Sequence, residues 1–116
     1  MTLKAYQNTQ AVTEDSRATE YRLFGQVTGA LIDAQKRGIA GGPLAEALDW
    51  NRTLWRTLAA DCMDDRNALT GDVRAKIVSL SLWVTKYSKQ VSRTGASLDP
   101  LITINRTIME GLSGTP

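Results

Sequence analysis

Few side chains in this sequence are suited to catalysis, and the partners that they would need are missing. The chain has one cysteine, Cys62, and no histidine. A cysteine nucleophile needs a neighbouring base, most often a histidine, and histidine is also the commonest metal ligand. Cys62 falls on the apolar face of a predicted helix, where a free cysteine is usually a small core residue. We therefore expect no catalytic residue, no metal site and no enzymatic activity.

The glycine-rich stretch at residues 38–43 is the one segment that could be compared with a phosphate-binding loop. Such a loop follows a strand and carries a lysine after its last glycine, because the lysine contacts the phosphates. Here Pro43 follows the glycines, and the pattern before them is helical. The stretch is predicted to end one helix and turn the chain, with no nucleotide or other cofactor bound.

Three polar residues fall on the apolar faces of predicted helices. Glu20, Asn51 and Asn105 all lie among residues that helical spacing places towards a core. A site made of a carboxylate and two amides is one interpretation. A buried hydrogen-bond network that fixes the register of the helices is the other. We favour the network, because nothing nucleophilic or metal-binding joins the three.

The elements that position these residues are predicted to be four helices. Apolar residues recur at helical spacing over about residues 16–36, 43–63, 71–92 and 99–112, and no stretch alternates as a strand would. Thr13, Asp15 and Ser16 offer side-chain oxygens to cap the first helix, and Thr70 offers one to the third. Residues 1–15 show no sustained periodicity and form a leader that carries Tyr6. The fold class is therefore all-α: a small antiparallel four-helix bundle, with residues 16–112 as its single domain.

The third predicted helix is apolar on two sides. Val78 and Leu82 lie opposite the seam that includes Val84, and Trp83 lies at its flank. Such a helix is either at the centre of its bundle or covered by a partner. Trp50 is likewise off its helix's apolar stripe, so it either covers the core edge or anchors a partner. The candidate partner-binding residues are Tyr6, Trp50, Val78, Leu82 and Trp83.

Charge and hydropathy limit the possible partners. Fourteen basic and twelve acidic residues give a net charge of +2. The basic residues are dispersed, apart from Lys86, Lys89 and Arg93, and a nucleic-acid surface would show a denser stripe with aromatic residues in it. No apolar run is long enough to cross a membrane, and the N-terminus lacks a signal peptide. We expect a cytoplasmic protein that binds no membrane, and the pattern of basic residues does not support nucleic-acid binding.

Five segments, taken in order, resemble the FlaF family of alphaproteobacterial flagellar proteins. They are residues 5–7 (AYQ), 50–55 (WNRTLW), 67–69 (NAL), 73–80 (VRAKIVSL) and 101–106 (LITINR). The resemblance implies a role in flagellin production and secretion, often opposed by the translational repressor FlbT. The start of the chain is also similar to FliS, a flagellin export chaperone that is an antiparallel helical bundle. In FliS-like chaperones the leader can occupy the groove that holds flagellin.

These resemblances imply a flagellin-binding export chaperone that regulates flagellin synthesis and secretion. The partner would be an amphipathic terminal segment of flagellin, with FlbT as a further partner. The alternative is a post-transcriptional regulator that acts on flagellin messenger RNA, directly or through FlbT. A structural subunit of the flagellar assembly is a third option.

Overall fold

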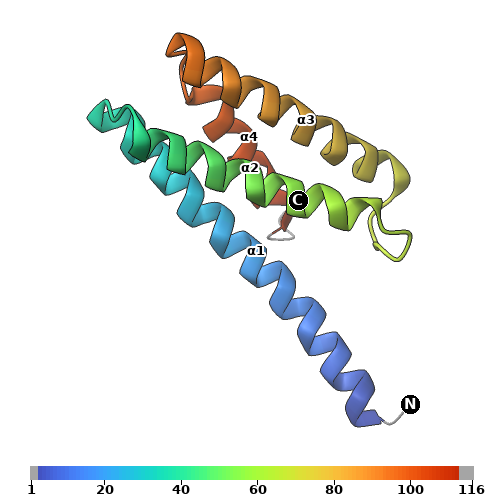
Figure 1. Ribbon diagram of the computed structural model, residues 1–116. Coiled ribbons are helices and arrows are strands. Elements are labelled where there is room, and N and C mark those ends of the chain that lie inside the picture. The colour runs from blue at the N-terminus through green and yellow to red at the C-terminus, as the bar shows by residue number, and fades with distance from the viewer. Residues whose placement is uncertain (1–2, 113–116) are drawn as a thin grey trace.

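The computed structural model describes the backbone of residues 3–112 and the side chains of residues 18–111, and it is all-helical there (Figure 1). Its four helices are α1 (Leu3–Arg37), α2 (Gly42–Met63), α3 (Gly71–Thr94) and α4 (Asp99–Leu112). No strand occurs among the described residues. The predicted fold class is confirmed.

The first helix begins much earlier than the sequence pattern indicates. The predicted cap at Thr13, Asp15 and Ser16 is wrong, because α1 starts at Leu3 and runs through the predicted leader. Residues 3–17 contain neither glycine nor proline, so nothing in them breaks a helix. The first turns of the α1 backbone project beyond the other three helices (Figure 1). The side chain of Tyr6 lies outside the described part of the chain.

The connections between helices follow the predicted turn chemistry. Gly38, with φ 62°, stops α1 in the left-handed conformation that glycine adopts without strain. The Thr70 hydroxyl accepts a hydrogen bond from the Val73 amide at 3.4 Å, so this predicted cap is present. Gly95, with φ 69°, ends α3 and donates from its amide to the Val91 carbonyl at 2.9 Å.

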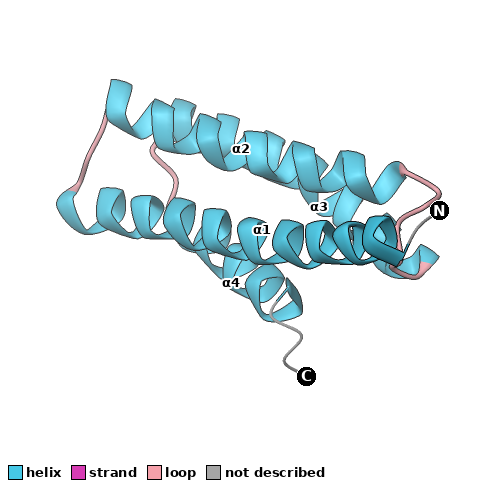
Figure 2. Cartoon of the chain, turned by 90° about the horizontal axis from the view of Figure 1, so that it is seen from below, coloured by secondary structure: helices cyan, strands magenta, loops and turns pink. Residues whose placement is uncertain are grey.

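The core lies between α2 and its neighbours. Helix α2 packs against both α1 and α3, and α1 also packs against α4 (Figure 2). Helix α4 also contacts α2 through buried side chains, and Figure 1 shows it behind α2. Trp55 of α2 is fully buried, and its ring meets that of Phe24 edge to face at a centroid distance of 5.7 Å.

The position of α3 decides between the two interpretations of its second apolar side. The packing of α3 is extensive with α2 alone, so α3 is not the central helix of the bundle. Its buried residues are Ile77, Ser81, Val84, Ser88 and Val91, a single stripe that faces α2. Of its other apolar residues, Val78, Leu80 and Tyr87 are half-buried and packed against the core. Leu82 at 66% and Val73 at 41% are exposed.

Candidate functional site

The buried polar residues form a hydrogen-bonded chain between α2 and α4. The Trp55 indole nitrogen donates to Asn105 Oδ1 at 2.8 Å, and Asn105 Nδ2 donates to Asn51 Oδ1 at 2.7 Å. Asn51 and Asn105 are both 0% exposed, so no substrate reaches them. The predicted register network is therefore present for the two asparagines. Trp55 is a member that the sequence pattern did not identify, because it falls on its helix's apolar face.

Glu20 and Cys62 lie near each other but are not arranged for catalysis. Glu20 is half-buried, and Cys62 is 2% exposed. Burial, then the charge of Asp61, and to a smaller extent that of Glu20, raise the pKa of the Cys62 thiol, whereas Arg74 lowers it. The thiol stays protonated near neutral pH, and a protonated thiol is a poor nucleophile.

The described side chains supply no site for a metal ion. Among residues 18–111, no cluster of three or more histidine, cysteine, aspartate or glutamate side chains occurs. None of the helical segments within this range is both long and apolar enough to cross a membrane.

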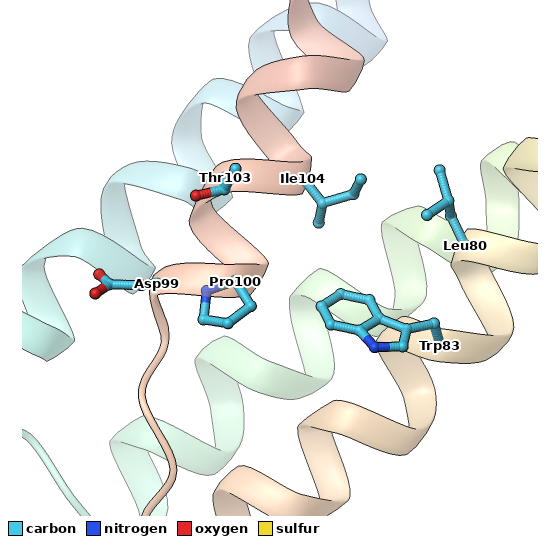
Figure 3. Close-up of a pocket in the computed structure, with 6 residues that line it drawn as sticks. All are labelled: Leu80, Trp83, Asp99, Pro100, Thr103 and Ile104. Atoms are coloured by element: carbon cyan, nitrogen blue, oxygen red, sulfur yellow. The ribbon is translucent and has the colours of Figure 1, made fainter.

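An apolar hollow lies between α3 and α4. It has a volume of about 530 Å³ and is lined by Leu80, Trp83, Asp99, Pro100, Thr103 and Ile104. The Trp83 ring extends from α3 towards Pro100 and Ile104 of α4 (Figure 3). A second hollow of about 390 Å³ shares Leu80 and adds Ala75, Lys76 and Ser79 of α3. We call the two hollows together the α3–α4 groove.

Trp83 is held in place within this groove. Its ring stacks on that of Tyr87 at a centroid distance of 5.1 Å and an interplanar angle of 15°. The Tyr87 hydroxyl donates to the Ser97 carbonyl at 2.6 Å, which ties the pair to the loop before α4. Trp83 is nevertheless 37% exposed. A large, partly exposed ring with little freedom is a good anchor for a protein partner.

The candidate residues predicted from the sequence do not form one surface. Val78 and Leu82 lie one turn apart on α3, and Leu82 is about 100° from Trp83 around the helix. Because Trp83 faces α4, Leu82 lies on the other flank. Trp50 is 38% exposed on α2, about 200° from Arg52, and Arg52 lines a hollow with α3 residues. Trp50 therefore faces away from α3.

The α4 half of the groove was not identified from the sequence. The sequence analysis predicts a helix over residues 99–112 but places no candidate partner-binding residue on it. A usable pattern exists on α3, where Leu80, Trp83 and Tyr87 recur at spacings of three and four on one flank. It shows an apolar flank but not which helix, or which partner, faces it.

Comparison with known proteins identifies the family. The sequence model of the family described as flagellar protein FlaF matches residues 2–112, almost the whole chain. No curated protein and no solved structure gives a significant match. FlaF is a family of flagellar proteins and not of enzymes. The chain, whose described part is an all-helical bundle with an apolar groove between α3 and α4, belongs to the FlaF family of flagellar proteins.

Proposed function

We propose that this protein is a cytoplasmic, nonenzymatic chaperone that binds flagellin and supports its synthesis and export. The observation that carries the proposal is the α3–α4 groove, which is apolar and left uncovered by the described part of the chain. The occupant that we propose is one amphipathic helical segment from an end of flagellin. Its apolar face would lie between Trp83 and Ile104.

The physical argument is the helix-in-groove mode of recognition. An amphipathic helix buries its apolar residues at positions i, i+3, i+4 and i+7 in a groove between two helices of the partner. Unassembled flagellin ends with exposed apolar faces would associate with one another, and a chaperone that covers them would prevent this. A segment that folds on binding loses entropy, so its affinity stays moderate and its release remains easy.

Binding of a fluorescently labelled flagellin terminal segment tests the proposal. Trp83→Ala should weaken binding by more than about tenfold, the scale of a lost aromatic hot spot. Trp50→Ala is the matched control, because Trp50 is exposed to the same degree, 38% against 37%, but lies away from the groove. Circular dichroism should show both variants as helical as the wild type. Equal affinities of the two variants would refute the groove assignment.

Regulation of flagellin synthesis through messenger RNA, directly or through FlbT, is the alternative function. Its support is the group of basic residues near the end of α3, including Lys89 and Arg93. If flagellin still copurifies with this protein after ribonuclease treatment, the result favours the chaperone. Copurification that is lost after this treatment would favour the regulator.

A further inference from the structure

A third hollow, with different chemistry, lies on the other flank of α3, between α3 and α2. It has a volume of about 510 Å³ and is lined by Arg52 of α2 and by Lys89, Ser92 and Arg93 of α3. The three α3 residues follow the spacing i, i+3, i+4, which places them on one face of the helix. Three basic side chains and a hydroxyl therefore border one hollow, which we call the basic hollow.

The positive charge of the basic hollow is only partly compensated. Arg52 Nη2 lies 3.3 Å from Asp49 Oδ1, and the carboxylate of Asp49 is 69% exposed. Arg52 Nε is buried and has no hydrogen-bond partner among the described residues. Within the same part of the chain, neither Lys89 nor Arg93 has an ion pair. At least two positive charges thus remain without a counter-charge where an anion would be attracted.

We propose that the basic hollow binds the carboxylates of an acidic protein segment. The exposed Arg93 guanidinium presents a planar fork that matches carboxylate geometry, and the Lys89 ammonium and the Ser92 hydroxyl can each donate a further hydrogen bond. Leu82 lies seven residues before Lys89, two helical turns along the same flank, and is 66% exposed. The bound segment therefore carries acidic residues at one end and an apolar residue about 10 Å away along α3.

The same geometry argues against a nucleic-acid strand as the occupant. Proteins that bind single strands combine a basic groove with aromatic rings on which the bases stack. No aromatic side chain lines the basic hollow. Trp83 lies on the opposite flank of α3, and Trp50 faces away from α3. The proposal does not rest on flagellin being the partner in the α3–α4 groove.

A hexaglutamate peptide is the probe, with hexaglutamine and an oligouridylate of equal charge as comparisons. Binding is followed on the full chain by amide chemical shifts at low ionic strength, because exposed ion pairs are screened by salt. Hexaglutamate should shift the amides around Lys89 and Arg93, and hexaglutamine should not. The combined variant Arg52→Gln, Lys89→Gln, Arg93→Gln should bind hexaglutamate about tenfold more weakly, the scale of three partly exposed pairs.

The matched control removes the same number of charges elsewhere. Arg22→Gln, Lys36→Gln and Arg106→Gln, all exposed and outside the hollow, should together change affinity by less than about threefold. If Arg52→Gln disturbs the fold, the exposed pair Lys89→Gln and Arg93→Gln gives the same test with a smaller loss. Equal losses in the two sets, or no binding of hexaglutamate, would overturn the proposal. Tighter binding of the oligouridylate, lost in the same variant, would also overturn it in favour of nucleic acid.

Discussion

The side chain of Asn105 accepts a hydrogen bond from Trp55 and donates one to Asn51, so a single amide joins two positions of α2 to α4. Buried amides are costly unless they are paired, and a shift of either helix along its axis would break both bonds. Apolar contacts alone tolerate such shifts better than hydrogen bonds do. The network therefore favours one register of α4 against α2.

Replacing Asn105 with alanine should cost more stability than the same change at Asn51. The Asn105 variant loses two hydrogen bonds and leaves Trp55 Nε1 and Asn51 Oδ1 unpaired, so the free energy of unfolding should fall by about 2–4 kcal/mol. Asn51→Ala loses one of these bonds and also removes an Nδ2 group that already has no partner in the described structure. Urea denaturation measures the free energy of unfolding of both variants. Equal losses, or loss of flagellin binding without loss of stability, would place Asn51 in a different role.

The buried thiol of Cys62 should make stability depend on alkaline pH. Because the pKa is raised above 9.0 in the folded protein, the unfolded chain deprotonates first as the pH rises. The contribution of the buried neutral thiol is thus fully present below about pH 9 and is lost as the pH rises through the folded pKa. Subtracting the Cys62→Ala stability curve from that of the wild type isolates this contribution. A difference that stays constant between pH 8 and pH 10 would contradict the assignment.

At the scale of elements, α1 differs from the other helices in its length. Its 35 residues would span about 52 Å, and the longest dimension of the molecule is 54 Å. Among the described side chains of α1, residues 18–37, the first buried one is Phe24. The early turns of the backbone extend beyond the other helices and add to the length of the molecule (Figure 1).

Deleting residues 1–12 should leave the melting temperature almost unchanged. Helices gain most of their stability in proteins from packing, and these turns of α1 project beyond the other helices (Figure 1). Differential scanning calorimetry measures the effect, and a loss of several degrees would show that the segment belongs to the core. Binding of the flagellin segment to the truncated chain tests the leader separately. Increased affinity would show that the leader competes for the groove, as the similarity to FliS implies.

Local features of this chain could be predicted from the sequence, whereas features that depend on tertiary packing could not. Spacing located the cores of all four helices, and Thr70 and Gly38 were identified because cap and stop residues act locally. The start of α1 was missed, because residues 3–15 show no sustained apolar periodicity. Periodicity also shows which face of α3 is apolar without showing what covers it. The groove depends on how α3 and α4 sit around α2, which is a tertiary property.

At the scale of the whole molecule, α3 separates two surfaces of different chemistry. The α3–α4 groove is apolar and contains Trp83, whereas the basic hollow between α2 and α3 contains Arg52, Lys89 and Arg93. Substitutions on opposite flanks of a rigid helix have independent effects on binding when the substituted residues share no partner. One protein could therefore hold an apolar helix and an acidic segment together.

The two surfaces should respond to different substitutions. Trp83→Ala should weaken binding of the flagellin segment and leave hexaglutamate binding within about twofold, since the sites share no residue. The combined glutamine variant of the basic hollow should weaken hexaglutamate binding and leave binding of the flagellin segment unchanged. Leu82→Asp should weaken hexaglutamate binding alone, through charge repulsion. Titrations of both probes against all three variants provide the check. Parallel losses would show that the two flanks form one site.

The three tryptophans occupy three different environments, so the chain carries its own optical reporters. Trp55 is enclosed in the core, and Trp83 borders the α3–α4 groove. Trp50 is exposed on the side of α2 that faces away from α3. An indole in a dry interior emits at shorter wavelengths than one in water. With Trp50 replaced by phenylalanine, the blue edge of the emission spectrum would follow Trp55 and hence the integrity of the fold. The red edge would follow Trp83 and hence the arrival of a ligand, in the same cuvette and without a dye.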